Sequence, residues 1–294
     1  MKIKDVENPV EEFRKLSKRF SLLNDRFLAV AMDYKYYIDS TITDNEIFKL
    51  RDNVIYKLQS AKFHFQLLLE YHDRIEYQLD KIYKTNPKTI IQNEIEFAIL
   101  QQRAIREIYS IFDSMIYHLC SIFDYLFRLI NFAHNKEIAE SPKWNLFQTN
   151  RNLKGYMFCS KEMVEKLKIF DQSFVYPLIK HRSYLIHTEN DTGEFTLSID
   201  LKDKKFDAKF LSTELFKNHF PEIVKENKNA DMTIKYSALW LIDKTIINAT
   251  EILFELSEDM QRNKKIEFGL FIRIGENNTI ESPSTPYWGN RKIN

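Results

Sequence analysis

The sequence predicts an all-α fold, a long-helix antiparallel bundle, with a small β-hairpin insertion at about residues 194–210. Apolar side chains recur at intervals of three and four over several long segments, as they do on one face of an amphipathic helix. Residues typical of helix N-caps precede these segments. Alternation of apolar and polar residues, which is typical of strands, is convincing in one region. We therefore expect helices along most of the chain and two strands in that region.

The first two helices have start signals in the sequence. Asn8 is suited to an N-cap, and the proline after it is suited to the first helical position. The apolar period continues from there to near Asp39. Thr43 and Glu46 form a capping box for a second long helix, which we expect to run to about residue 83.

The third helix is expected to start at Thr89, and its pattern continues to about Ala133. An unbroken helix of this length would be on the order of 60 Å long, so we expect either a kink or two helices in series. One polar stripe steps along it by three and four: Glu107, Ser110, Ser114, Tyr117, Ser121, Asp124 and Arg128. This stripe is either a strip facing solvent or a partner, or the wall of a cleft.

The fourth helix is expected to begin after Ser160 and carries Pro177 in its interior. Because proline lacks an N–H and clashes with the preceding turn, we expect a kink or a break there. Beyond a turn, residues 195–201 and 206–210 alternate in polarity, which predicts the hairpin. A last long helix is expected over about residues 233–263.

The predicted organisation has three consecutive parts. Residues 1–88 form N-terminal long helices that pack on the core, and residues 89–263 form the helical bundle that contains the hairpin. Residues 264–294 are expected to add a possible short strand at 266–274 and a loose tail, since the end of the chain is polar and contains prolines.

Composition restricts the kinds of function that are open to this chain. Forty-three basic and 42 acidic residues give a net charge of +1, so any binding of nucleic acid must be local. Two cysteines exclude a disulfide framework and a four-thiolate zinc site. The sequence has neither an apolar signal region nor an apolar stretch long enough for a membrane span. We expect a cytoplasmic protein without a membrane partner.

Glycine is rare, with five in the whole chain and none before Gly155. The phosphate-binding P-loop, the dinucleotide-binding G-x-G-x-x-G turn and the G-x-S-x-G elbow all need glycine in backbone turns. Their absence argues against nucleotide hydrolysis, hydride transfer on a Rossmann scaffold and serine hydrolase chemistry. An H-E-x-x-H helix is also absent. We expect no cofactor and no metal.

The stretch from Phe174 to Asn190 holds Arg182 and His187 with four residues between them. Arginine offers a fixed positive charge and a fork of donors suited to phosphate, and histidine exchanges a proton near neutral pH. In a continuous helix the two would lie roughly 140° apart and about 7.5 Å along the axis. Their tips converge if the arginine swings round, if the helix ends near His187 or if a second copy supplies half of the site. Arg128 and His134 form a second pair of this kind, with five residues between them.

Antiparallel packing of the third and fourth helices would place Arg182 opposite about residue 112 and His187 opposite about residue 107, to within one turn. This register brings Glu107 and Asp113 to the end of the bundle that carries the pair. These carboxylates are candidates to fix the tautomer of His187 and to orient Arg182. The alternative is structural: Arg182 forms a buried ion pair with one of them, and His187 is a cation favoured at a helix C-terminus.

The run His-Arg-Ser-Tyr-Leu-Ile-His at 181–187 resembles the R-x(4–6)-H signature of the HEPN superfamily, small helical bundles many of which are metal-independent ribonucleases. The resemblance covers this motif and the order of helices over about residues 89–262. It implies an HEPN-like four-helix core, Arg182 and His187 as catalytic residues, and a homodimer whose two motifs meet in one composite site. HEPN proteins usually have Asn, Asp or His directly after the arginine, so Ser183 departs from their pattern and leaves the helper role open.

The resemblance leads us to expect a metal-independent endoribonuclease that acts in a defence or toxin–antitoxin system, with RNA as substrate and an inhibitory protein as a possible partner. Such cleavage needs a base for the 2′-hydroxyl, an acid for the leaving 5′-oxygen and positive charge at the phosphorane. His187 serves as base or acid, and His181 is a second candidate for proton exchange. The alternative is a non-catalytic HEPN-like module for RNA or protein binding and dimerisation. A less favoured third reading is a small-molecule sensor with an aromatic-lined cavity.

Overall fold

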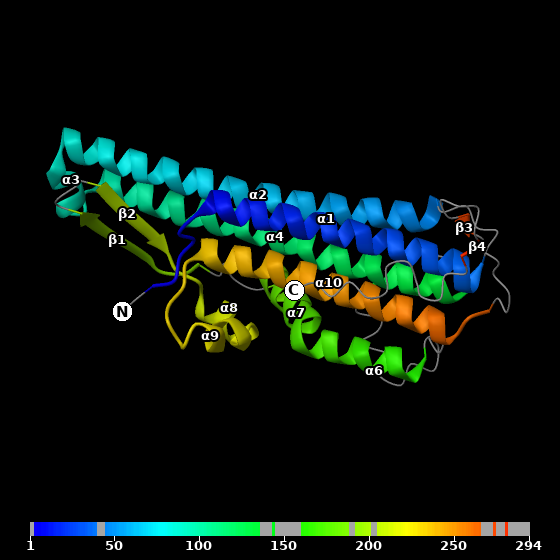
Figure 1. The fold of residues 1–294 in the computed structure, drawn as a ribbon. Helices are drawn as coiled ribbons and strands as arrows, with labels where there is room; N and C mark the ends of the chain where they lie inside the picture. The colour runs from blue at the N-terminus through cyan, green and yellow to red at the C-terminus, as the bar shows by residue number, and fades with distance from the viewer. Residues whose placement is uncertain are drawn as a thin grey trace. The chain divides into compact units, whose positions relative to one another are not determined.

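The computed structural model of the 294-residue chain is mostly helical (Figure 1). The residues that it describes are 3–39, 45–135, 143–144, 160–187, 192–200, 205–265, 273–274 and 280–281. No helix in these ranges combines the length and the apolar character that a membrane span requires.

The chain begins with two long helices. Helix α1 spans Pro9–Asp33 and continues directly into the π-helical turn η1, Tyr34–Ile38. Helix α2 spans Asn45–Thr85. The capping box predicted at Thr43 lies outside the described residues.

The third predicted helix starts later than its sequence signal. A short helix, α3, occupies Pro87–Ile91, with Asn86 as its N-cap. Helix α4 then spans Ile95–Asn135 as one helix of 41 residues. The start predicted at Thr89 is therefore corrected, because Asn93 adopts a positive φ of 51° that ends α3.

The segment before the Arg182–His187 pair is helical throughout, with a change of winding near Pro177. Helix α6 spans Lys161–Phe170, and the Ser160 side chain accepts a hydrogen bond from the Met163 N–H at its start. The π-helical turn η2, Asp171–Val175, follows, and helix α7 spans Tyr176–His187. The wider π-helical turn accommodates the missing N–H and the ring of the proline, so the chain neither breaks nor stops there.

The last third of the chain contains the strands. Strand β1, Phe195–Asp200, pairs antiparallel with β2, Lys205–Phe210, and Leu197 is opposite Ala208. Two short helices, α8 at Glu214–His219 and α9 at Pro221–Glu226, lead to the long helix α10, Ile234–Arg262. Most of the segment predicted at 266–274 lies outside the described residues; Arg273–Ile274 (β3) pairs with Ile280–Glu281 (β4).

Packing divides the chain into two compact units, and the boundary falls within α2, α4 and α10 and after the first residue of α1 and of α7. Unit 1 consists of Met1–Pro9, Leu58–Cys120 and Pro177–Asp243. Unit 2 consists of Val10–Lys57, Ser121–Tyr176 and Lys244–Asn294. These units group residues by packing rather than by order in the sequence, so the consecutive parts 1–88, 89–263 and 264–294 stay a prediction.

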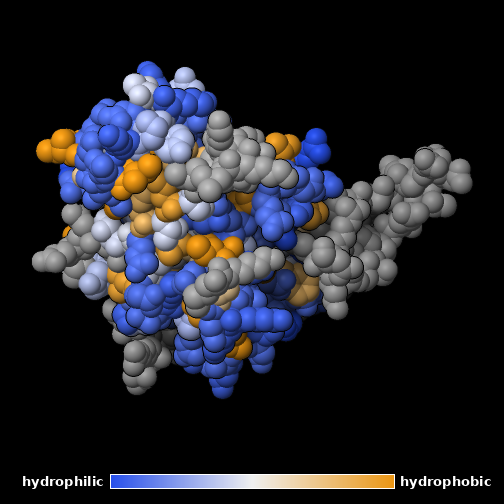
Figure 2. All heavy atoms as spheres, turned by 90° about the vertical axis from the view of Figure 1, so that its left-hand side faces the viewer, coloured by the Kyte–Doolittle hydropathy of each residue, from blue (hydrophilic) through white to orange (hydrophobic). Residues whose placement is uncertain are grey.

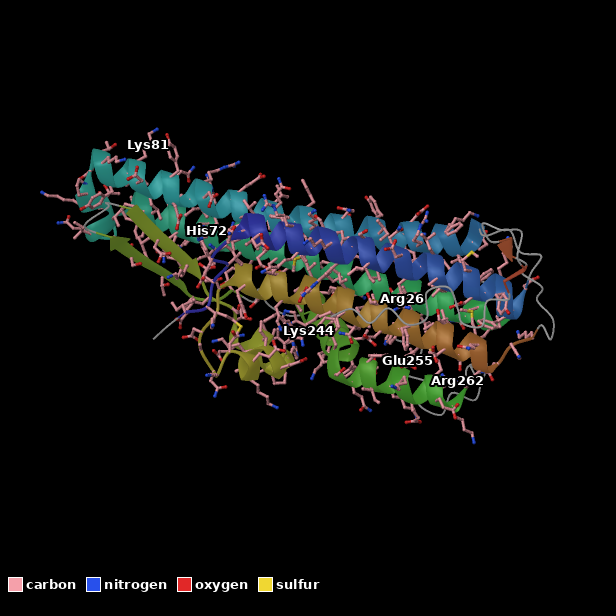
Figure 3. All side chains as sticks on the ribbon, in the orientation of Figure 1. Arg26, His72, Lys81, Lys244, Glu255 and Arg262 are labelled. Carbon is pink, nitrogen blue, oxygen red and sulfur yellow. The ribbon has the colours of Figure 1, made fainter. Side chains whose placement is uncertain are left out.

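In unit 1, side chains of α2 hold the main chain of β2 (Figures 1 and 3). His72 is buried, and its Nε2 lies 2.5 Å from the Ala208 carbonyl oxygen. The Ala208 N–H donates to Glu76 Oε1 at 2.9 Å. Since His72 and Glu76 are one helical turn apart, they hold both polar groups of one strand residue. We call this arrangement the Ala208 clamp.

Unit 1 also exposes some apolar side chains. Figure 2 looks onto the side that carries α3, β1 and β2, and hydrophobic residues appear there in separate groups among hydrophilic ones. Ile95 and Ile99, which are four residues apart at the start of α4, are 79% and 61% exposed. Nothing in the described part of the chain covers them.

Unit 2 buries charged side chains beside its apolar core. Arg26 of α1 (labelled in Figure 3) is 7% exposed, and its guanidinium lies 5.1 Å from the centroid of the Phe254 ring. Asp33, at the end of the same helix, is 6% exposed. Burial raises the pKa of Asp33 to about 6, although Ser257 and the charge of Arg26 act in the opposite direction. Unit 2 therefore contains a carboxyl group that titrates close to neutral pH.

Candidate functional site

Helix α7 presents one polar face to solvent and one apolar face to the core. Leu178 and His181 are buried. Lys180, Tyr184 and His187 are exposed, and they follow each other at intervals of four and three. Residues at these spacings are neighbours on a helix surface. The exposed face of α7 thus carries an ammonium group, a phenol and an imidazole side by side, together with the hydroxyl of the exposed Ser183.

Arg182 does not share this face with His187. Helix α7 continues through His187, so the two residues are separated by about 140° around the axis. Arg182 is half-buried, and its Nε atom is buried without a hydrogen-bond partner in the described part of the chain. No ion pair of Arg182 is found among the described residues. The structural alternative, in which Arg182 pairs with a carboxylate of α4, therefore has no support from those residues.

His181 is a core residue, 1% exposed. Its ring lies 5.6 Å from the Phe216 ring and 5.7 Å from the Phe220 ring, and its Nδ1 is 3.0 Å from Nδ1 of His219. Burial, with a smaller effect of His219, lowers the pKa of His181 to about 3. His181 is consequently neutral near pH 7 and shielded from solvent, which is unfavourable for direct proton exchange with an RNA.

Helix α7 packs beside α4 within unit 1. The Cys120 thiol donates to the Leu178 carbonyl at 3.6 Å. Phe112 of α4 and His181 of α7 both contact the Phe216 ring, at 5.7 and 5.6 Å. The register of the two helices agrees to about one turn with the one that the sequence predicts, in which Arg182 is opposite residue 112.

The two carboxylates predicted to support the pair lie in unit 1. Glu107 accepts a hydrogen bond from the Tyr71 hydroxyl, and its other oxygen lies 3.6 Å from Nε of Arg103. Asp113 is half-buried. Among the described residues, the recorded partners of Glu107 are on α2 and on its own helix, rather than on α7.

The histidine of the second Arg–His pair belongs to the interior of unit 2, and its arginine is half-buried. His134 Nε2 lies 3.1 Å from Asp259 Oδ2, and the two side chains are 5% and 0% exposed. Burial opposes ionisation of Asp259, but hydrogen bonds from His134 and Ser160 lower its pKa. The Arg128 guanidinium lies 5.3 Å from the centroid of the Tyr125 ring. A similar spacing thus gives a histidine buried against a carboxylate here and an exposed histidine in α7.

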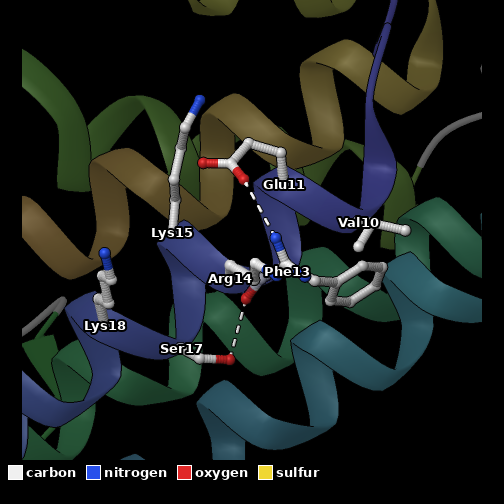
Figure 4. Close-up of a pocket in the computed structure, with 7 residues that line it drawn as sticks. All are labelled: Val10, Glu11, Phe13, Arg14, Lys15, Ser17 and Lys18. Atoms are coloured by element: carbon white, nitrogen blue, oxygen red, sulfur yellow. Dashed lines mark hydrogen bonds and ion pairs between the residues drawn. The ribbon is translucent and has the colours of Figure 1, made fainter.

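Two other features are weaker candidates for a site. His72, Asp73 and Glu76 have possible ligand atoms within 4.8 Å of one another, but His72 and Glu76 use theirs in the Ala208 clamp. A surface depression along α1 is lined by seven residues of that helix alone: Val10, Glu11, Phe13, Arg14, Lys15, Ser17 and Lys18 (Figure 4). Its Arg14 is paired with Glu11 at 3.9 Å. Neither feature includes residues of the α7 motif.

One residue beside the motif was not identified from the sequence. His219, at the end of α8, is half-buried and lies next to α7, with its ring 6.4 Å from the Tyr184 ring. Burial and the positive charge of Lys180 lower the pKa of His219. It is 32 residues after His187 in the sequence, and no spacing rule relates the two. The only sequence signal would have been the polar His219 between Phe216 and Phe220 in a short helix.

Comparisons with protein-family models, with curated proteins and with solved structures found no match to this chain.

Proposed function

We propose that the chain is a metal-independent endoribonuclease that uses Arg182 and His187. The observation that carries this proposal is the contrast between the histidines of the two Arg–His pairs, since neither Arg128 nor Arg182 has an ion pair among the described residues. His134 is buried against Asp259, whereas His187 is exposed on α7 and Arg182 has no carboxylate partner among the described residues. An exposed imidazole and an arginine that is not committed to an ion pair are both available to a phosphodiester.

The reaction is attack of the RNA 2′-hydroxyl on the adjacent phosphorus. His187 exchanges a proton with one of the two reacting oxygens, and Arg182 binds the phosphate oxygens, where negative charge accumulates. Proton exchange of this kind contributes about 10² to 10⁴ in rate. The products are a 2′,3′-cyclic phosphate and a free 5′-hydroxyl, and no step requires a metal ion.

A homodimer is part of the proposal. Because Arg182 and His187 lie on different sides of α7, the arginine of one copy clamps the phosphate beside the histidine of the other. An HEPN-like nuclease of this kind would be restrained by an inhibitory protein in a defence or toxin–antitoxin setting. RNA is the substrate, and an exposed Tyr184 beside His187 offers a ring on which a base can stack.

The direct test is cleavage of a mixed-sequence RNA in EDTA, with analysis of the product ends. Wild-type protein should leave 2′,3′-cyclic phosphates, and Arg182→Ala and His187→Ala should each lose at least about 10²-fold in rate. The matched controls are Arg74→Ala and His64→Ala, which remove an exposed arginine and a half-buried histidine of α2 in the same unit. The proposal fails if wild type is inert, or if its activity survives in both motif variants.

The dimer has a separate test by mixing two inactive variants. In a mixed dimer of Arg182→Ala and His187→Ala chains, the composite site keeps one of its two pairings of an arginine with the histidine of the other copy. Random exchange between the two variants should therefore restore about a quarter of the wild-type rate. A mixture that stays as inactive as its components would show that both residues must come from one chain.

A second candidate function is a non-catalytic module that binds RNA or a protein. It is favoured by the exposure of Tyr184 and Ile186, which are 40% and 47% accessible next to the motif. Exposed aromatic and aliphatic side chains are typical of binding surfaces. In this case wild-type protein would bind the RNA without cutting it, and Tyr184→Ala would weaken binding more than His187→Ala does.

A further inference from the structure

Each pairing of Arg182 with the His187 of the other copy supplies one exposed histidine, which leaves half of the proton transfer without a group to perform it. The 2′-hydroxyl must lose a proton and the leaving 5′-oxygen must gain one, and His187 is suited to one of these steps. The second group that the sequence suggests, His181, is buried. The structure brings another imidazole, that of His219, to the same side of α7.

The place of His219 is defined by three residues of α7. Its Nδ1 lies 3.0 Å from Nδ1 of the buried His181, and its ring is 6.4 Å from the Tyr184 ring. The charge of Lys180 also acts on it. Tyr184 and His187 are three residues apart on the helix and therefore neighbours on its surface. Within unit 1, His187 and His219 thus lie on either side of Tyr184, with Lys180 close by.

We propose that His219 is the second proton-exchanging residue of this site, and that the buried His181 is the positioning residue that fixes its ring. This inference rests on the proposed function and gives it a base within the same chain. His219 takes the proton of the 2′-hydroxyl, and His187 gives a proton to the 5′-oxygen. Lys180 adds positive charge near the phosphate.

Either histidine can donate in the contact between the two Nδ1 atoms, and the assignment of base uses the tautomer in which His219 donates. With the Nδ1 proton of His219 donated to Nδ1 of His181, the lone pair of His219 is on Nε2, the atom left to meet the substrate. When Nε2 accepts a proton, the resulting imidazolium keeps the same hydrogen bond to a histidine that is itself neutral. Burial and Lys180 also favour the neutral form of His219 before the reaction.

The step is balanced without a further reactant. The O2′–H bond breaks and its proton goes to His219 Nε2, while the O2′–P bond forms. The P–O5′ bond breaks, and O5′ takes a proton from the imidazolium of His187. The cyclic phosphate and the 5′-hydroxyl leave, and solvent returns the two imidazoles to their starting protonation states.

The experiment compares two substrates and three variants. One substrate is an ordinary RNA dinucleotide within an oligomer, and the other has sulfur in place of the bridging 5′-oxygen, a leaving group that needs no proton. The variant His219→Asn keeps a hydrogen-bonding atom near the position of Nδ1 but cannot take up a proton. His187→Ala removes the proposed acid. The matched control is His64→Asn, since His64 is also half-buried and its ring lies 5.0 Å from that of another histidine, His118.

The expected pattern separates base from acid. On ordinary RNA, both His219→Asn and His187→Ala lose about 10²-fold or more in rate, and His64→Asn does not. On the sulfur substrate, His187→Ala recovers to near the wild-type rate, whereas His219→Asn stays slow. The reverse pattern, with recovery of His219→Asn alone, would overturn the assignment of base.

The positioning role of His181 has a readout of its own. In His181→Phe the ring of His219 loses the acceptor that stabilises its imidazolium, so the acidic limb of the kcat/KM profile should move to lower pH. The titratable and charged groups that face His219 are His181, Lys180 and Tyr184. An unchanged acidic limb would reduce His181 to a packing role and overturn that part of the proposal.

Failure of the two proposals gives different results. If wild type cuts RNA and His187→Ala does not, but His219→Asn is as active as wild type, the nuclease stands and the role of His219 is refuted. If wild type leaves both substrates intact, the proposed function is refuted, and the inference about His219 falls with it. Circular dichroism of each variant checks that a loss of rate is not a loss of fold.

Discussion

Acidification should destabilise this protein through one buried imidazole. His181 has a pKa of about 3 in the folded chain, because it is enclosed by Phe216 and Phe220 and faces His219. In the unfolded chain its pKa returns to about 6.5. As the pH falls below 6.5, His181 is protonated in the unfolded state but stays neutral in the folded state. The free energy of unfolding therefore decreases as the pH falls from 6.5 toward 3.

The size of the effect follows from the two pKa values. Between pH 7 and pH 5, a histidine with values of 6.5 and about 3 removes about 2 kcal/mol from the free energy of unfolding. Asp33 acts in the opposite direction, since its pKa is raised to about 6 and its contribution to stability decreases as the pH rises. A difference between wild type and a His181 variant cancels the contribution of Asp33, which is common to both, and leaves the contribution of His181 together with any change in the pKa of its neighbour His219.

The assay is urea denaturation of wild type and His181→Phe at pH 7 and pH 5. Phenylalanine suits the aromatic cluster and does not titrate, so the variant should lose about 2 kcal/mol less than wild type over this interval. Absolute stability of the variant at pH 7 is not the test, since the contact with His219 is also removed. Equal pH dependence in the two proteins would refute the argument that His181 is held neutral in the folded chain.

Two further predictions concern stability alone. Gly193→Ala should cost about 1 to 3 kcal/mol, because the new Cβ would clash with the carbonyl oxygen of Leu211. Urea denaturation measures this cost, and the control Thr192→Ala, at the exposed position before the glycine, should cost far less. His134→Ala should cost about 3 to 5 kcal/mol by leaving the fully buried Asp259 without its histidine partner. The control Lys168→Ala removes one member of a surface ion pair and should cost less than about 1 kcal/mol. Similar costs for the two would show that the buried pair is not held as described.

Local sequence signals predicted the helices better than their interruptions. The N-cap signal of Ser160 is followed by α6, and the alternating residues 195–210 contain β1 and β2. The positive φ at Asn93 and the π-helical turn before Pro177 were not predicted. Both features are local changes in backbone conformation that depend on tertiary packing. Neither repeats along the sequence, so an analysis of periodicity does not detect them.

For the candidate site, spacing in the sequence identified two Arg–His pairs but could not rank them. His134 and His187 have similar local patterns, and what separates them is the carboxylate of Asp259, 125 residues after His134 in the chain. His219 was missed for the same reason, since its relation to α7 arises from tertiary packing. Burial and long-range partners decide these roles, and neither is visible in a motif.

The Ala208 clamp also has a consequence for association between molecules. In an antiparallel pair, every second residue of a strand directs its N–H and C=O toward the partner strand. The Leu211 N–H donates to the Glu194 carbonyl, so Leu211 is one of these residues. Ala208, three residues earlier, therefore directs its N–H and C=O to the edge of β2 away from β1. That edge would otherwise offer a template for strand addition. Occupation of its central N–H and C=O by Glu76 and His72 interrupts the template at its midpoint. Helix α2 thus protects the free edge of β2. Loss of the His72 and Glu76 side chains would leave the Ala208 N–H and C=O available for pairing with a strand of another molecule.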